Sequence, residues 1–157
     1  MAWTIPKTDW NNGELVSADD MNTIGENLAS LANPQAKASF VTPSDIVTYS
    51  NSFVDIDSEN MNFAITTTGR DVLAHFQGVV HRADSSDLTV RFLVDVDGTR
   101  HGSHVSAGIG DYNYLISFTH LIENLSAGSH TFKFQWTQQH NKGVRLKWGA
   151  HAWVREI

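Results

Sequence analysis

A length of 157 residues predicts one domain, or one domain with an appendage, and allows a substantial hydrophobic core. The hydrophobic content of 41% and the charged content of 18% exclude a disordered chain, which would have fewer hydrophobic residues and more charge. The net charge of −6 disfavours nucleic acid and anionic membranes as partners, and the lack of cysteine excludes thiol chemistry.

The first 13 residues show no hydrophobic periodicity and carry Trp3 and Trp10 among polar neighbours. This pattern predicts an extended arm. No apolar run typical of a secretion signal follows Met1, and no stretch of about 18 apolar residues could span a membrane. We therefore expect the chain to be made in a cytoplasm.

Residues 18–32 are predicted to form a helix. Ser17 is a suitable N-cap, and Asp20 stands three residues later, at the spacing of a capping box. Four apolar residues then recur at helical spacing on one face: Met21, Ile24, Leu28 and Leu31. Asn33-Pro34 ends the helix. Because an isolated helix of about 15 residues is marginal in water, this stripe requires cover from the rest of the chain, from sister subunits or from another protein.

A second part, residues 35–157, is predicted where the hydrophobic period changes from 3.6 to 2. We expect a mainly β fold, an antiparallel β-sandwich (jelly roll) of about eight strands. The expected strands span 38–42, 46–49, 53–56, 61–66, 72–81, 88–96, 112–120, 132–136 and 144–154. Asp97-Gly98 predicts a two-residue hairpin, and the glycines between Gly102 and Gly110 predict a loop. No helical pattern interrupts the strands, which disfavours a parallel sheet.

The residue patterns indicate no active site. His101 and His104 lie three apart, and His75 and His81 share a predicted strand, but no further zinc-ligand motif accompanies them. Residues 95–99 lack the remaining oxygen ligands of a calcium loop. There is also no G-x-S-x-G elbow and no phosphate-binding loop. We therefore expect no enzymatic activity, no catalytic residue, no metal and no cofactor, with a small polysaccharide-degrading enzyme as the disfavoured alternative.

The tryptophans of the last strands divide by parity. Trp136 and Trp148 fall on the inward parity and are predicted core residues. Trp153 falls on the outward parity with four polar neighbours: Arg145, Lys147, His151 and Arg155. This stripe is predicted to be a subunit interface, with a capsid-facing surface or a glycan-binding platform as the alternatives.

The segment WNNGELVSADDMNTIGENL, residues 10–28, resembles the N-terminal module of many tailed-phage and prophage virion proteins. In that module a Trp, a Gly-Glu/Asp pair, Val-Thr/Ser-Ala and Leu/Met-Asn lead into a helix that ends near Asn-Pro. Four later sequence segments resemble parts of a sandwich domain that follows this module: ITTTGRDVL (65–73), FLVDVDGTR (92–100), LSAGSHTFK (125–133) and WVREI (153–157). The element order is also similar to the trimeric tumour-necrosis-factor and C1q-like jelly rolls.

The resemblance implies a virion component made in the host cytoplasm: a capsid decoration (cement) protein. It implies a homotrimer whose partner is the major capsid protein or another virion protein, with no nucleic acid and no membrane. The alternative is a head- or tail-fibre tip that binds host-surface glycans. The expected assembly interface comprises Trp3, Trp10, Met21, Ile24, Leu28, Leu31, Trp153 and Arg155.

Overall fold

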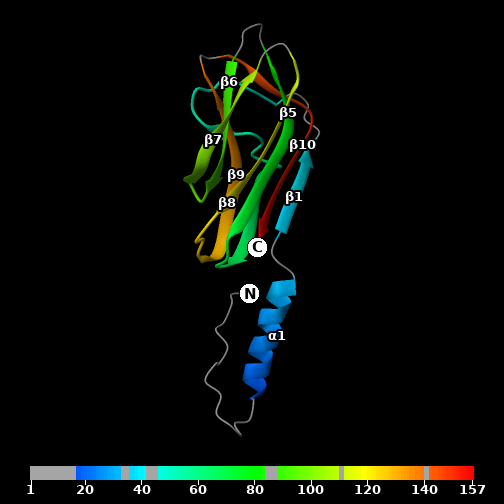
Figure 1. The fold of residues 1–157 in the computed structure, drawn as a ribbon, viewed down its shortest axis with the longest axis vertical. Helices are drawn as coiled ribbons and strands as arrows, with labels where there is room; N and C mark the ends of the chain where they lie inside the picture. Colours follow the sequence, from blue (N-terminus) through cyan, green and yellow to red (C-terminus); the bar gives the residue numbers. More distant parts are fainter. Residues whose placement is uncertain (1–16, 33–35, 42–45, 84–87, 110–111, 140–141) are drawn as a thin grey trace.

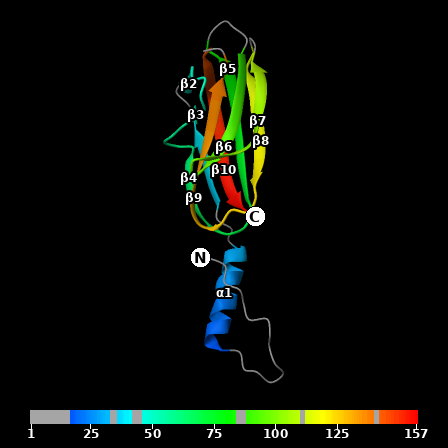
Figure 2. The ribbon, with the colours of Figure 1, turned by 90° about the vertical axis from the view of Figure 1, so that its left-hand side faces the viewer.

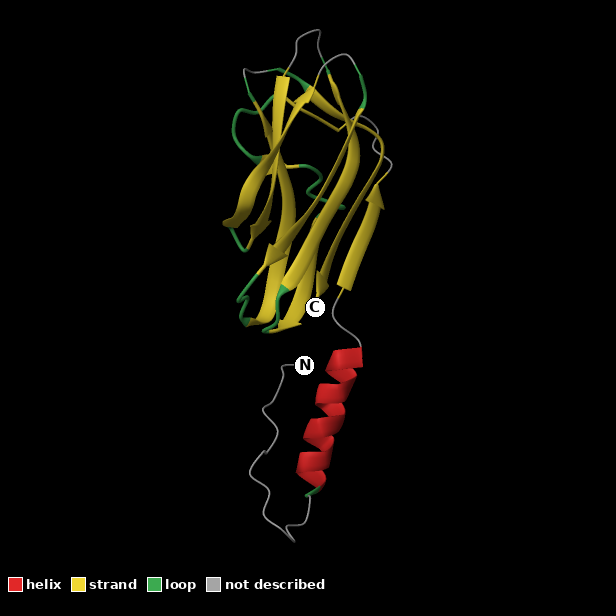
Figure 3. Ribbon diagram, viewed as in Figure 1, coloured by secondary structure: helices red, strands yellow, loops and turns green. Residues whose placement is uncertain are grey.

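Two antiparallel β-sheets lie face to face in the computed structural model of the chain, and one helix extends from an end of them (Figure 1, Figure 3). The structure describes residues 17–32, 36–41, 46–83, 88–109, 112–139 and 142–157. The helix, α1 (Ala18–Ala32), precedes every described strand in the sequence.

The first sheet is built around the last strand of the chain. Its order is β1 (Ala36–Val41), β10 (Val144–Glu156), β5 (Val72–Arg82) and β8 (Tyr114–Ile122). The short strand β2 (Ile46–Thr48) also pairs with β10, beyond the segment that pairs with β1. β1 and β2 therefore act as one interrupted edge strand.

The second sheet has the same design. β3 (Val54–Asp55) and β4 (Asn62–Thr68) pair with successive segments of β9 (Ala127–Gln138). β6 (Leu88–Val96) follows β9, and β7 (Thr99–Ile109) forms the far edge. β3 and β4 thus form a second interrupted edge strand.

With each interrupted edge taken as one position, each sheet has four strand positions in the described part of the chain. The chain alternates between the layers: it passes from β1 and β2 to β3 and β4, back to β5, across to β6 and β7, back to β8, across to β9 and back to β10. This order is that of a jelly roll. The predicted antiparallel β-sandwich of about eight strands is confirmed.

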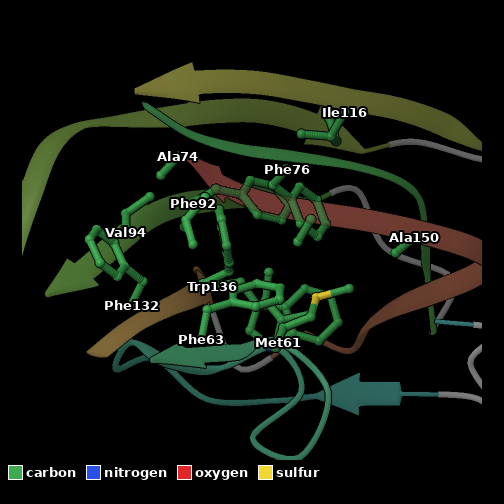
Figure 4. Packing of buried hydrophobic residues seen from close by; sticks show 14 of the residues in the cluster. Met61, Phe63, Ala74, Phe76, Phe92, Val94, Ile116, Phe132, Trp136 and Ala150 are labelled. Atoms are coloured by element: carbon green, nitrogen blue, oxygen red, sulfur yellow. The ribbon is translucent and has the colours of Figure 1, made fainter. Parts of the chain in front are cut away.

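The core between the sheets is rich in aromatic rings (Figure 4). Phe76 of β5 and Phe92 of β6 come from opposite sheets, are fully buried, and stack with ring centroids 5.7 Å apart. Trp136 is 1% exposed, as its parity predicts, and lies beside Phe92. The side chain of Trp148 lies outside the described residues. Burying each such side chain contributes roughly 1.5–3 kcal/mol, so this layer dominates the stability of the sandwich.

The hairpin predicted at Asp97-Gly98 is confirmed. Both residues have positive φ, 52° at Asp97 and 85° at Gly98, and they join β6 to β7 as a two-residue turn. Such turns match the right-handed twist of the flanking strands, and Asp and Gly are the residues that tolerate them.

The prediction of a loop from Gly102 to Gly110 is wrong. Residues up to Ile109 continue β7 and pair with β6, while Gly110 lies outside the described residues. The register shifts between Phe92 and Val94, opposite Gly102, whose φ is +88°. The glycine therefore marks an irregularity within an edge strand. In the local sequence, an edge strand with such glycines resembles a loop.

Helix α1 has the predicted bounds and begins with the predicted capping box. The Ser17 N–H donates to Asp20 Oδ2, and the Asp20 N–H donates to Ser17 Oγ, each at 3.1 Å. The helix extends along the long axis of the sandwich, from the end where β1 begins and the C-terminus lies (Figure 1, Figure 2). Within the described residues, α1 makes no extensive contact with a strand.

Candidate functional site

The apolar stripe of α1 is open where the structure describes its side chains. Met21 is 59% exposed and Ile24 is 36% exposed. Among the residues that the structure describes, neither side chain belongs to the buried core of the sandwich. The other predicted interface side chains of the leading segment lie outside the described residues: Trp3, Trp10, Leu28 and Leu31.

A stacked pair of rings occupies the outer face of the first sheet. Trp153 of β10 pairs in register with His75 of β5, and their rings stack with centroids 5.1 Å apart at 20°. His75 Nδ1 shares a hydrogen bond of 2.9 Å with Thr119 Oγ1 on β8. Burial, together with the nearby His151, lowers the pKa of His75 below its ordinary 6.5. The imidazole is therefore neutral at pH 7 and packs on the indole as an aromatic ring.

Exposed apolar side chains surround this stack on the same face. Arg155, which is exposed, pairs in register with Leu73, and Leu73 pairs with Leu121, which is 41% exposed. Further along β8, Leu115 is 63% exposed. Arg155 also pairs with Ala36, the first residue of β1, so it lies at the end of the sandwich that α1 leaves.

The predicted interface residues therefore occupy two surfaces. Trp153 and Arg155 share the outer face of the first sheet, whereas Met21 and Ile24 lie on the helix beyond its end. Sequence reasoning missed His75 as the stacking partner of Trp153. Both residues have outward parity, but only the strand register places them side by side.

A small cavity lies where the edges of the two sheets meet. It has a volume of about 110 Å³ and is lined by His101 of β7, His120 of β8 and core residues such as Phe92 and Phe118. Burial and the neighbouring His101 lower the pKa of His120 below its ordinary value. Pockets for sugars or drug-sized ligands are several times larger, at about 300–1,000 Å³, so this cavity has room only for a very small molecule.

The histidines considered as metal ligands are distributed over the fold. His75 and His81 lie on β5, His101 lies at the edge cavity, and the side chain of His104 lies outside the described residues. Among the side chains that the structure describes, no three or more of His, Asp and Glu gather in a way that could hold a metal ion.

Buried polar side chains that the sequence did not single out join separate elements. His130 of β9, which is 8% exposed, lies 2.6 Å from Asp97 Oδ2 through Nδ1 and 2.8 Å from the Ser126 carbonyl oxygen through Nε2. Glu156 of β10, 1% exposed, accepts hydrogen bonds from the N–H and the hydroxyl of Thr68 on β4. These contacts fix turns and connect the two sheets, which is a structural role.

Comparison with known proteins gives no family. No protein-family model matches the chain, and no curated protein is similar to it. No helix in the described part is long and apolar enough to cross a membrane.

Solved structures with partial likeness are diverse. One is infectious bursal disease virus, Gx strain, with a TM-score of 0.49 and 9% identity, over 78% of this chain and 32% of that one. Another is latent PorU from Porphyromonas gingivalis, with a TM-score of 0.39 and 7% identity, over 79% of this chain and 13% of that one. A third is tailspike protein 4 of bacteriophage CBA120, with a TM-score of 0.26 and 12% identity, over 74% and 19%.

The chain spans about a third of the length of the virus protein and less of the other two. At TM-scores below 0.5, these likenesses carry no argument about function. The strand order and two exposed surfaces therefore characterise the described part of this protein: a jelly roll whose helix exposes Met21 and Ile24, and a sheet face that carries Trp153, Leu115 and Leu121.

Proposed function

We propose that the chain is a structural protein of a virus particle, without enzymatic activity, which decorates and stabilises the capsid. The observation that carries the proposal is the open apolar stripe on α1, beside a sandwich whose own core is complete. The resemblance of residues 10–28 to the N-terminal module of tailed-phage virion proteins supports the same reading and favours a bacteriophage.

The sandwich does not need α1 in order to bury its apolar side chains. Phe76 and Phe92 are fully buried between the sheets, while Met21 is 59% exposed on the helix. Burying a methionine or isoleucine contributes roughly 1.5–3 kcal/mol, so covering the stripe would stabilise any assembly that does so. The exposed stripe of α1 is therefore suited to a protein that acts by assembling with other chains.

Mass action then supplies the mechanism. Contacts that form only in the assembled shell add their binding free energy to its stability. The arm predicted over residues 1–15 would span about 50 Å when extended, at about 3.3–3.6 Å per residue, and could reach neighbouring subunits. Trp3 and Trp10 would anchor it in apolar pockets of those neighbours.

A role without catalysis is supported by how the polar groups are used. His130 is held by Asp97 and Ser126, and Glu156 is held by Thr68. The cavity beside His120 is too small for a saccharide substrate. These groups serve packing and turn geometry.

A fibre tip that binds host glycans is the second candidate. The stack of Trp153 on His75 beside Arg155 favours it, since aromatic and basic side chains both contact sugars. It is the weaker candidate because His75 covers one face of the indole. The predicted loop from Gly102 to Gly110, which could have contacted a glycan, is instead part of strand β7 up to Ile109.

The two candidates separate in one binding experiment. Purified chain is added to capsids of the parent virus that lack it, and separately to host cells and their surface glycans. The decoration role predicts saturable binding to capsids and a higher temperature of capsid disruption. Binding to cells or glycans, without capsid affinity, would favour the fibre tip and refute decoration.

A further inference from the structure

The edges of the two sheets meet at a pair of histidines. β8 ends the first sheet and β7 ends the second, and the two strands are in contact along one side of the sandwich (Figure 2). His120 of β8 is in register with Ala74, and His101 of β7 is in register with Val94. Ala74 and Val94 are both fully buried, so the two histidines have the inward parity of their strands. Both line the small cavity at this edge.

The ring of His120 packs where Gly102 leaves β7 without a side chain. A Cβ on Gly102 would lie 2.7 Å from Cε1 of His120, 2.9 Å from Nδ1 and 3.0 Å from Nε2. The register of β7 shifts at this point, and Gly102 has a φ of +88°. The missing side chain and the irregular backbone therefore give the ring its place, and a movement of the ring would change how β8 packs on β7.

The cavity offers no negative charge to a protonated histidine. Its other lining residues are not ionisable: Phe92, Leu93, Val94, Phe118 and Thr119. Two neutral imidazoles pack there without mutual repulsion. Two protonated imidazoles would place like charges beside each other in a partly buried site, which disfavours the closed edge.

The charged groups of the surrounding strands face elsewhere. Those of β6 and β7 have outward parity: Arg91, Asp95 and Arg100. On β5, His75 lies on the outer face, and Arg82 lies at the opposite end of the strand from Ala74. Asp97, in the β6–β7 turn, is engaged by residues of β9. The side chain of His104 on β7 lies outside the described residues.

The pKa of His120 is consistent with this arrangement. Burial, together with the nearby His101, lowers it below its ordinary 6.5. A histidine with a lowered folded-state pKa contributes its stability fully above the unfolded pKa and loses it as the pH falls toward the folded pKa. The closed edge is therefore favoured at neutral pH and weakened in mildly acidic solution.

We propose that His101 and His120 form an acid-sensitive latch, which holds the edges of the two sheets together while both rings are neutral and releases β7 from β8 when they are protonated. The latch goes beyond the proposed function and does not rest on it. Because the pairing within each sheet is not involved, the sandwich opens locally at this edge before it unfolds.

Hydrogen exchange of the full chain measures the latch strand by strand. Exchange is followed at about pH 7.5 and about pH 5.5, where histidine titrates, and is corrected for the intrinsic pH dependence of amide exchange. In the intact chain, we expect the corrected exchange of β7 and β8 to rise about three- to tenfold at the lower pH, since one pKa unit corresponds to a factor of about ten. The exchange of β9 and β10, which are central in their sheets, is expected to stay constant.

His120→Gln removes the titrating group and keeps a polar side chain at the same position. It should abolish the acid-induced rise, whereas His81→Gln, on the part of β5 that pairs with Arg145, should retain it. His101→Gln tests the pair from the other strand, and it carries the test if circular dichroism shows that His120→Gln does not fold. The absence of a rise in the intact chain, or a rise that persists in a folded cavity variant, would overturn the latch.

Discussion

At the scale of single residues, Asp97 and His130 form the clearest structural lock. Both ring nitrogens of His130 face acceptors, the Asp97 carboxylate and the Ser126 carbonyl oxygen. Asp97 Oδ1 also accepts the Thr131 N–H at 2.8 Å. These hydrogen bonds connect the β6–β7 turn and Ser126, just before β9, to His130 and Thr131 of β9. The sequence predicts the turn from Asp97-Gly98, but not the histidine that holds it, since that pairing spans 33 residues.

The pH dependence of Asp97 follows from this geometry. The Thr131 N–H and His130 hold the pKa of Asp97 below its ordinary 3.8, against a smaller opposing effect of burial. A carboxyl with a lowered folded-state pKa contributes stability above its unfolded pKa and loses it as the pH falls through the folded pKa. The Asp97 contribution is therefore complete at neutral pH and disappears in acid.

We predict that Asp97→Asn lowers the free energy of unfolding by about 1 kcal/mol at pH 7, a modest effect because the carboxylate is half exposed and screened by solvent. The variant should also lose less stability than the intact chain between about pH 5 and about pH 2. Urea unfolding at several pH values measures both. Glu59→Gln, an exposed carboxylate before β4, is the control; an identical acid profile for Asp97→Asn and the intact chain would contradict the lock.

Two glycines give a matched test of the edge where the sheets meet. Both have positive φ, +88° at Gly102 and +85° at Gly98, so alanine is strained at either position. A Cβ at Gly102 would lie 2.7 Å from the His120 ring, whereas one at Gly98 meets nothing within 4 Å. We predict that Gly102→Ala costs about 1–3 kcal/mol more than Gly98→Ala in thermal or urea unfolding. Equal losses in the free energy of unfolding for the two variants would mean that the His120 ring does not pack against Gly102 of β7.

At the scale of elements, local signals were sufficient for some predictions and insufficient for others. The bounds of α1 were predicted correctly because the cap at Ser17, the apolar stripe and Asn33-Pro34 are all local signals. β7 was mistaken for a loop because its edge position depends on pairing with β6, which the glycines conceal. The stack of Trp153 on His75 likewise depends on strand register, which parity alone does not give.

The capping box is expected to stabilise α1 without affecting the stability of the sandwich. Ser17→Ala removes the acceptor of the Asp20 N–H, and the loss of an N-cap costs about 0.5–2 kcal/mol. We predict a lower helical circular dichroism signal with an unchanged unfolding midpoint of the sandwich. Ser30→Ala, the same exchange inside the helix, is the control and should preserve the helical signal. A lower sandwich midpoint for Ser17→Ala alone would show that α1 packs on the strands.

At the scale of the whole molecule, the jelly-roll order follows from strands that the hydrophobic alternation largely located. What the alternation does not give is the role of the leading segment. The division at residues 34 and 35 stays a prediction, supported by the change of period and by the position of α1 beyond the sandwich (Figure 1). Two surfaces then remain for assembly: the α1 stripe and the outer face of the first sheet.

Removal of the arm tests that division. We predict that deletion of residues 1–15 leaves the sandwich folded, with its β signal and unfolding midpoint retained, but abolishes binding to the capsid. The physical reason is that Trp3 and Trp10 would anchor on neighbouring subunits and not on the core of their own chain. Loss of the sandwich fold on deletion would show that the arm completes the monomer.

The account depends most on the α1 stripe being covered by other chains. Sedimentation equilibrium of the intact chain, beside a Met21→Ser/Ile24→Ser variant, measures this directly. We predict the mass of three chains for the intact protein and of one chain for the variant, with the same β-sheet spectrum for both. An intact protein that sediments as a single chain at every concentration, with a stable helix, would contradict the account.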